Sequence, residues 1–387
     1  MDLSYTADEE AFRAELRSFL EGVVPRDEPP EDEDAEFEWM RAFQRRMHAG
    51  GWAGIHWPRE YGGRGATPMQ QAIFAEEMAR ARAPQLVNRV GINNVGPTLM
   101  HFGTEEQKAR FLPGILSADE IWCQLYSEPD AGSDLAALRT RAELEGDDYV
   151  VSGQKVWTSY ARQSRWAILL ARTDPEAPKH RGISYLIVDM RAPGIEIRPL
   201  RQLTGAAEFN EVFLDRVRVP RSHLVGRPGE GWRVAQVTLA HERGTNFAIK
   251  EQVLARIAVD ELCEQAAARG RSGDPVWRQR LADLFLRTEI MRFLNLQMLT
   301  RLGRGEMPGA ESSIVKNFWA ELSQAIGDAS MALLGPHGLL VRGSPHAVAG
   351  GRFAQRMLFS RAATIAGGTS EIQRNIIAQR LLGLPRG

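Results

Sequence analysis

The spacing of hydrophobic and polar residues changes twice along the chain, which divides it into three stretches. In the first stretch, apolar residues recur at helical spacing in three segments: 8–20, 37–49 and 69–81. Thr104 is followed three residues later by Gln107, a pattern typical of a capped helix start. We therefore predict an all-helical N-terminal domain over residues 1–120.

In the second stretch the hydrophobic residues no longer recur at helical spacing. Its short runs, rich in β-branched residues and separated by Gly, Pro and Asp, are 149–158, 167–171, 184–189, 195–200 and 211–219. Runs of this length with turn residues between them are typical of antiparallel strands. We expect a middle β-barrel or sandwich domain over residues 121–230.

In the third stretch the helical period returns and the segments become long. They cover 232–268, 275–301, 312–334 and 368–382, with Gly- and Pro-rich breaks between them. Long amphipathic segments joined in this way predict a four-helix bundle over residues 231–387. The whole pattern is that of an α+β multidomain protein.

Composition narrows the class of protein. Of the 387 residues, 43% are hydrophobic and 25% are charged, which describes a globular chain with a large core. A net charge of −1 gives no overall field for nucleic acid, and no apolar run approaches the ~18 residues of a membrane span. Two cysteines, Cys123 and Cys263, suit a reducing cytoplasm, and no Cys/His cluster has the spacing of metal ligands. We expect a cytoplasmic protein without a metal.

Two segments carry candidate chemistry. The first, residues 125–135, is a strand that breaks at Pro129 into a turn of Asp, Gly and Ser, where hydroxyls and backbone N–H groups can bind a polar ligand. The second, residues 153–159, alternates so that Trp157 and Ser159 share one face. An indole beside a hydroxyl suits a flat ring with ring nitrogens. Without further information, the residues alone favour an ordinary proline-ended strand and a common sheet tryptophan.

These segments, S-E-P-D-A-G-S-D at 127–134 and K-V-W-T-S at 155–159, resemble the flavin-binding signature of the acyl-CoA dehydrogenase family. Three further segments match that family's landmarks in order and spacing: WAGIHWPREYGGRG at 52–65, FGTEEQKARFLPGIL at 102–116 and IAGGTSEIQR at 365–374. The resemblance implies the three-domain fold, FAD as cofactor, and oxidation of an acyl-CoA to the trans-2,3-enoyl-CoA. It also implies that electrons pass to an electron-transfer flavoprotein.

The resemblance assigns roles to individual residues. No protein side chain accepts a hydride, so FAD must do so while the protein positions it. The FAD-binding residues implied are Tyr126, Ser127, Gly132, Trp157, Thr158, Ser159, Thr369 and Glu371. Those implied to contact acyl-CoA are Ser133, Arg243 and Gly367.

The catalytic base occupies a less common position. Many relatives carry a catalytic Glu in the last motif, where this chain has A-G-G-T at 366–369 and lacks the carboxylate. Relatives of the isovaleryl and long-chain type carry the base on the first helix of the C-terminal bundle, immediately before an Arg. Glu242 precedes Arg243 here, so the resemblance implies Glu242 as the base. His241 has a suitable intrinsic pKa but no family pattern supports it.

Departures from the family pattern leave the assembly open. In the family, two elements reach the FAD of a neighbouring subunit. In this chain the first element, at 269–275, lacks the family's Phe, and the second lacks the family's Gln before Gly335. We expect a homotetramer, with an α2β2 heterotetramer as the alternative. An acyl-CoA oxidase-like flavoenzyme and a non-catalytic subunit of a heteromer also remain open. Small residues at Ala366 and Gly367 predict a pocket for branched or polycyclic acyl groups.

Overall fold

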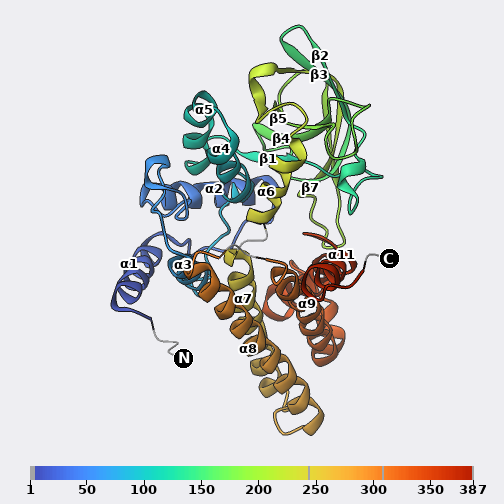
Figure 1. Cartoon of the computed structure of the whole chain (residues 1–387). Coiled ribbons are helices and arrows are strands. Elements are labelled where there is room, and N and C mark those ends of the chain that lie inside the picture. Colours follow the sequence, from blue (N-terminus) through green and yellow to red (C-terminus); the bar gives the residue numbers. More distant parts are fainter. Residues whose placement is uncertain (1–4, 243–244, 307–308, 386–387) are drawn as a thin grey trace. The chain divides into compact units, whose positions relative to one another are not determined.

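A computed structural model describes residues 5–242, 245–306 and 309–385, without the side chains of residues 240–247. Contacts group the chain into two compact units (Figure 1). A helical unit comprises Met1–Arg17, Thr67–Arg82 and Arg243–Gly387. A β unit comprises Ser18–Ala66 and Ala83–Glu242.

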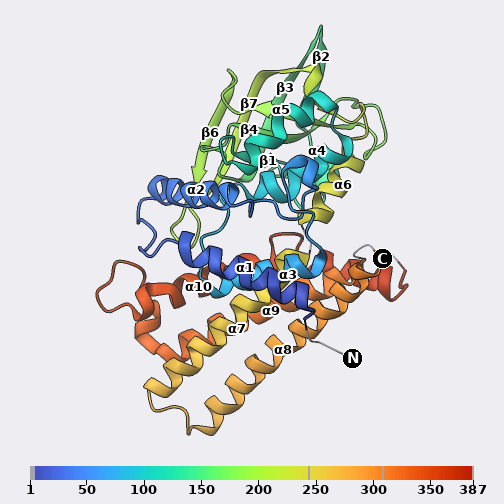
Figure 2. The same cartoon turned by 90° about the vertical axis from the view of Figure 1, so that its left-hand side faces the viewer.

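The β unit contains one mostly antiparallel sheet, which confirms the predicted middle β domain. Its strands are β1 (Trp122–Leu125), β2 (Arg141–Glu145), β3 (Asp148–Ser159), β4 (Trp166–Arg172), β5 (Ile183–Asp189), β6 (Ile195–Leu200), β7 (Phe209–Pro220) and β8 (Leu224–Val225). The strand order is β6-β7-β3-β2-β4-β5-β8, and β1 pairs with β4 in parallel (Figure 2). β2 was not among the predicted strands, because its five residues include only two apolar ones, Ala142 and Leu144, and no β-branched one.

The centre of this sheet is buried on both faces. Along β4, Ile168 and Leu170 belong to one hydrophobic core, whereas Ala167 and Leu169 belong to the core on the other face. Alternate residues of a strand point to opposite faces, so this continuous apolar run fills two cores at once.

Helices cover the first of these faces. They are α4 (Gly96–Phe102), α5 (Glu105–Leu116) and α6 (Gly231–Glu242), while α2 (Glu33–Ala49) completes the unit (Figure 1). The predicted cap of α5 is confirmed: Thr104 Oγ1 accepts from the Gln107 N–H over 3.2 Å, and Gln107 Oε1 accepts from the Thr104 N–H over 3.1 Å. Gln107 Nε2 also donates to the carbonyl of Leu224 over 2.9 Å, which joins α5 to β8.

The helical unit confirms the predicted C-terminal helical domain. It contains α3 (Pro68–Arg80), α7 (Thr245–Ala268), α8 (Pro275–Gly303), α9 (Ser312–Leu334), α10 (Arg352–Ser360) and α11 (Ser370–Ile376), together with the start of α1 (Ala7–Val23). Figure 2 shows α7 and α8 lying alongside each other. The predicted helix 232–268 is described as two helices, α6 and α7. No helix in the described part of the chain is long and apolar enough to cross a membrane.

Short 3-10 or π segments connect these elements: Arg59–Tyr61, Gly91–Val95, Leu135–Ala137, Arg221–His223, Gly335–Leu339, Val348–Gly351, Arg361–Thr364 and Ile377–Leu381.

Candidate functional site

The strand β1 leads into a tight turn. Glu128 and Ala131 exchange two backbone hydrogen bonds of 3.1 Å across this turn, which has Pro129 at its start. Proline presets the backbone φ that a turn requires at this position. The turn leaves Gly132 and Ser133 exposed, so both are accessible to a ligand.

A buried ion pair fixes this turn to the sheet. The Lys155 ammonium, which is fully buried, donates to Glu128 Oε1 over 2.8 Å and to the carbonyl oxygens of Tyr126 and Leu170. The Glu128 carboxylate also accepts from the N–H and the hydroxyl of Thr140 over 2.9 and 2.6 Å. Burial of charges is costly unless they are paired and hydrogen-bonded. Here both conditions are met, since each charge has its partner and further hydrogen bonds.

Burial and pairing together shift the pKa of both members of the pair. Burial alone would raise the pKa of Glu128, but the Lys155 charge and the surrounding hydrogen bonds outweigh it and hold that pKa below its ordinary value. Burial lowers the pKa of Lys155 to about 8, against the attraction of Glu128. Sequence reasoning did not single out either residue. The sequence did contain a hint of the pair, because one signature segment contains an acidic residue, Glu128, and the other contains the basic residue Lys155.

Trp157 is held in a conformation that tryptophan rarely adopts. Its φ is +60°, at a break in the register between β3 and β7 that spans Lys155 to Thr158. The left-handed region costs a non-glycine residue about 1–2 kcal/mol. The indole is nevertheless 61% exposed, and its ring contact with Phe209 is edge-on, with ring centroids 6.1 Å apart. A strained backbone that presents an apolar ring to the surface indicates a ligand platform.

The residues beside the indole alternate as predicted. Val156 and Thr158 are buried, whereas Ser159 is partly exposed like Trp157. Among the described residues, the buried Thr158 hydroxyl and Asn210 Oδ1 have no hydrogen-bond partner, although Asn210 Nδ2 donates to the Thr158 carbonyl over 3.0 Å. Such orphaned groups each cost roughly 1–3 kcal/mol.

These residues fit a flat heteroaromatic cofactor. The Trp157 indole offers a face for stacking, and the hydroxyls of Ser127 and Ser159, both partly exposed, can bond to polar atoms at a ring edge. The peptide N–H of Val156 donates to the Ser127 carbonyl over 2.9 Å, which holds turn and strand together. Tyr126, by contrast, is 4% exposed, so its side chain belongs to the core.

The second group of predicted residues lies in the helical unit. Gly367 and Gly368 have φ of +66° and +95°, and the Thr369 hydroxyl then caps α11 by accepting from the Ile372 N–H over 3.3 Å. Glu371 is exposed in the first turn, and hydrogen bonds from its own N–H and from Thr369 lower its pKa.

The glycine turn itself is held by two buried side chains. Lys316 Nζ donates to the Gly368 carbonyl over 2.6 Å, and Gln373 Nε2 donates to the Gly367 carbonyl over 3.0 Å. A Cβ at Gly368 would lie 2.7 Å from Gln373 Nε2, whereas a Cβ at Gly367 would meet nothing within 4 Å. The position where many relatives carry the catalytic carboxylate is therefore open space.

The predicted base, Glu242, and its neighbours lie partly outside the residues that the structure describes. Glu242 is the last residue of α6, but its side chain and that of His241 lie outside the described part, as does Arg243 entirely. The β unit brings together the turn residues 126–133 and the strand residues 157–159. Gly367, Thr369 and Glu371 are grouped in the helical unit.

A chain of buried hydroxyls fixes α6 one turn before Glu242. Thr238 Oγ1 lies 2.8 Å from Thr98 Oγ1 on α4 and 3.3 Å from the Tyr185 hydroxyl on β5. Burial raises the pKa of Tyr185 to about 12, although hydrogen bonds from Thr238, Tyr126 and Thr98 draw it down in part. Sequence reasoning missed this chain because its members are isolated polar residues in apolar segments.

Comparison with known proteins identifies the chain. Residues 6–119, 123–217 and 229–382 match the family models of the acyl-CoA dehydrogenase N-terminal, middle and C-terminal domains. Acyl-CoA dehydrogenase IpdE1 of Mycobacterium tuberculosis is 44% identical, with 98% of each chain covered.

Solved structures agree. The Tcur3481-Tcur3483 steroid ACAD has a TM-score of 0.90 at 35% identity, with 100% of each chain covered. The ChsE4-ChsE5 complex of Mycobacterium tuberculosis has a TM-score of 0.87 at 36% identity, again with 100% of each chain covered. The chain therefore belongs to the acyl-CoA dehydrogenase family of FAD-dependent oxidoreductases.

Proposed function

We propose that this protein oxidises the CoA thioester of a branched or polycyclic acyl group to its trans-2,3-enoyl form. The observation that carries the proposal is the strained, exposed Trp157 beside Ser159, held opposite the turn at Ser127. FAD, when bound, accepts the β-hydride of the substrate. The work of the chain is to bind that cofactor, orient the thioester and take the α-proton.

The β unit supplies the cofactor surface. Trp157 would stack against the flavin ring, while Ser159, Ser127 and the backbone of Tyr126 would bond to its polar edge. The Lys155–Glu128 pair holds turn and strand in register, so these groups are fixed before the cofactor binds. Preorganised donors cost no reorganisation when the reaction occurs.

Glu242 is the proposed base. Its carboxylate would take the α-proton, and the electron pair of that C–H bond would form the new C=C double bond. The β-hydrogen would leave as a hydride, with the electron pair of its own C–H bond. The position of Glu242 at the end of α6, one turn after the anchored Thr238, supports this role. Exclusion of water by the acyl chain would raise the pKa of the carboxylate and bring it closer to the pKa of the proton it removes.

The resemblance to the family assigns the remaining contacts. Thr369 and Glu371 would bind the ribityl and adenosine parts of FAD, and Ser133 with Arg243 would contact the CoA part of the substrate. The open space at Gly367 supports a wide acyl pocket. The likeness to a protein described as a steroid ACAD supports polycyclic acyl groups as substrates.

A second chain would complete the FAD site. Two elements that normally reach a neighbouring subunit's FAD depart from the family pattern here, at 269–275 and before Gly335. The two similar structures are each named as a pair, Tcur3481-Tcur3483 and ChsE4-ChsE5. We therefore favour an α2β2 assembly over a homotetramer. Light scattering would contradict both if it showed a stable flavin-loaded monomer.

Anaerobic reduction of the bound flavin tests the proposal. The full chain, with its partner where one co-purifies, is titrated with straight-chain, branched and steroid-side-chain CoA thioesters while the visible flavin absorbance is followed. We expect bleaching by at least one bulky thioester. Failure of every CoA thioester to bleach the flavin would reject the proposed reaction. Oxygen consumption during turnover would indicate an oxidase in place of transfer to an electron-transfer flavoprotein.

A further inference from the structure

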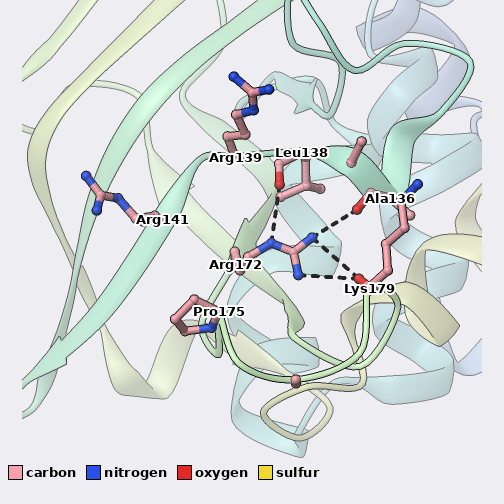
Figure 3. A pocket seen from close by; sticks show the side chains of 9 residues that line it. Ala136, Leu138, Arg139, Arg141, Arg172, Pro175 and Lys179 are labelled. Carbon is pink, nitrogen blue, oxygen red and sulfur yellow. Dashed lines mark hydrogen bonds between the residues drawn. The ribbon is translucent and has the colours of Figure 1, made fainter.

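Cations of this chain hold loops in place by donating to main-chain carbonyl oxygens. Figure 3 shows one example in the β unit, where the Arg172 guanidinium at the end of β4 donates to the carbonyls of Ala136 over 2.9 Å and Lys179 over 3.4 Å. These bonds join the segment before β2 to the loop after β4. In the helical unit, Lys316 Nζ donates to the Gly368 carbonyl over 2.6 Å. Hydrogen bonds from a charged donor are roughly twice as strong as neutral ones, so each of these cations can fix a loop.

Side chains of α9 contact the segment 361–374, which contains the glycine turn, at successive points. Besides Lys316, the contacts are the Arg361–Asp328 pair, the bond of 3.3 Å from Gln324 Nε2 to the Thr364 hydroxyl, and the Arg374–Glu321 pair. The side chains of both ion pairs are between 39% and 56% exposed, and exposed pairs contribute little. Lys316 is only 7% exposed, and its bond reaches the turn itself. We therefore expect the Lys316 bond to be the strongest of these contacts.

The glycine turn depends on side chains for its shape. Gly367 and Gly368 both have positive φ, and glycine loses more conformational freedom on folding than any other residue. Gln373 Nε2 donates to their carbonyls over 3.0 and 3.4 Å, but it belongs to α11, which begins two residues after the turn and would move with it. Lys316 lies 52 residues away along the chain and ties the turn to a different helix.

The position of the turn decides two features of the proposed site. A Cβ at Gly367 would meet nothing within 4 Å, and this open space is part of the proposed acyl pocket. Thr369, a proposed FAD contact, directly follows Gly368. A turn that moved into the open space would narrow the pocket and carry Thr369 with it.

We propose that Lys316 is a positioning residue that keeps the acyl pocket wide, because it holds the Gly367–Gly368 turn to α9. The proposal rests on the proposed function, since it takes the open space at Gly367 as part of the acyl pocket. Lys316 acts through the Gly368 carbonyl and needs no contact with substrate or flavin. The acyl groups that depend on it are the branched or polycyclic ones, because a straight chain needs less width.

The experiment compares the full-length wild type with Lys316→Met, which keeps nearly the length of the side chain but has no charge and no N–H donor. With FAD at saturating concentration, amide hydrogen exchange is measured over residues 365–376. Calorimetry measures the affinities for two enoyl-CoA products, one with a steroid side chain and one straight-chain, neither of which can reduce the flavin. We expect exchange in this segment to become about tenfold faster, since a lost charge-assisted bond corresponds to roughly that factor. The preference for the steroid-side-chain ligand should fall by a similar factor.

Two further variants make the comparison specific. Lys316→Gln keeps N–H donors on a shorter, uncharged side chain and should lie between wild type and Lys316→Met in both measurements. If Lys316→Met does not fold, Lys316→Gln carries the comparison. Ser330→Ala is the matched control on the same helix, because it removes a buried hydroxyl that donates to the Ile326 carbonyl. Ser330 lies roughly 21 Å along α9 from Lys316, at a rise of about 1.5 Å per residue, and its loss should change neither measurement.

Unchanged exchange over residues 365–376, or an unchanged preference between the two enoyl-CoA ligands, in the Lys316 variants would overturn the proposal. Faster exchange throughout the helical unit would also overturn it, because Lys316 would then stabilise the whole bundle. The anaerobic titration keeps the two proposals apart. If no CoA thioester bleaches the wild-type flavin while both changes appear in Lys316→Met, the reaction is wrong and the role of Lys316 stands. If thioesters bleach the wild-type flavin and neither change appears, the role of Lys316 is wrong and the reaction stands.

Discussion

The Lys155 ammonium lies 2.8 Å from the Glu128 carboxylate, with both side chains buried, and this pair joins the two halves of the flavin signature. Glu128 belongs to the turn after β1, and Lys155 immediately precedes the register break at Trp157. The same contact thus positions the loop that would meet the edge of the flavin and the indole that would meet its face. The charges themselves need not touch the cofactor to affect how well it binds.

The first prediction removes one charge of this pair. Glu128→Gln keeps the shape of the side chain but leaves the Lys155 ammonium buried without a counter-charge, which typically costs about 3–5 kcal/mol. Urea unfolding at neutral pH measures the loss, and the FAD content should fall with it. Glu145→Gln, which alters an exposed pair with Arg216, should cost less than about 1 kcal/mol. Equal losses in the two variants would contradict a special role for the buried pair.

The second prediction concerns how the folding stability changes at acidic pH. Burial opposes ionisation of Glu128, but the Lys155 charge and the hydrogen bonds to Thr140 and Arg139 prevail, so its pKa is lower in the folded protein than the ordinary 4.5. The folded carboxylate therefore binds fewer protons than the unfolded one. Its stabilisation is complete above that ordinary pKa and is lost as the pH falls through the lower, folded value. The stability difference between wild type and Glu128→Gln should narrow in acid. A difference that stayed constant down to the acid unfolding of the wild type would refute this.

The third prediction tests the indole platform. Trp157→Ala should lower the FAD content of the purified protein, because aromatic stacking contributes on the order of 1 kcal/mol beyond burial. Trp157→Phe keeps a ring and should retain more flavin. The folding stability should change little, since the indole is 61% exposed and its ring contact with Phe209 is edge-on. An unchanged flavin spectrum in Trp157→Ala would count against stacking at this position.

The fourth prediction addresses the anchor of α6. Thr238→Val keeps the shape of the side chain and removes its hydroxyl from between Thr98 and Tyr185, which should cost about 1 kcal/mol. Because α6 carries Glu242 one turn later, we expect kcat to fall while KM and FAD content stay near wild type. Thr288→Val is the matched control: the hydroxyl of this buried threonine of α8 donates to the Phe285 carbonyl within its own helix. A similar fall in kcat in both variants would indicate general destabilisation.

Local pattern was sufficient to predict most elements of the fold but not the register that shapes the site. The alternation of Val156, Trp157 and Thr158 was visible in the sequence and agrees with their burial. The φ of +60° at Trp157 was not visible in the sequence. It arises where β3 loses register with β7, a strand more than 50 residues away along the chain.

Long-range polar contacts were equally hidden. Thr98 and Thr238 are 140 residues apart, and each looks like an ordinary helix threonine in its own segment. The signature segments did contain Lys155 and Glu128, but only the folded chain shows that these two side chains meet. Motif reasoning thus located the site, whereas the contacts that hold it required the structure.

The fifth prediction removes the proposed base. Glu242→Gln keeps the shape of the side chain but cannot take a proton, so flavin reduction by a CoA thioester should slow by about 10²–10⁴-fold. FAD content and CoA affinity should remain near wild type. Glu230→Gln, just before the start of the same helix, should leave the rate unchanged. Wild-type rates in Glu242→Gln would move the base elsewhere, and His241 would be the next residue to test.

The open space at Gly367 offers a way to restore the reaction by another route. In the Glu242→Gln background, Gly367→Glu would place a carboxylate where many relatives carry theirs, and its Cβ would meet nothing within 4 Å. The φ of +66° imposes a strain of about 1–2 kcal/mol, which the fold must tolerate. We expect partial recovery with straight-chain CoA thioesters but not with polycyclic ones, because the new side chain would fill the space that admits them. Gly367→Ala in the same background carries the strain without the carboxylate. If it recovers as much activity as Gly367→Glu, proton abstraction from this position is not the cause.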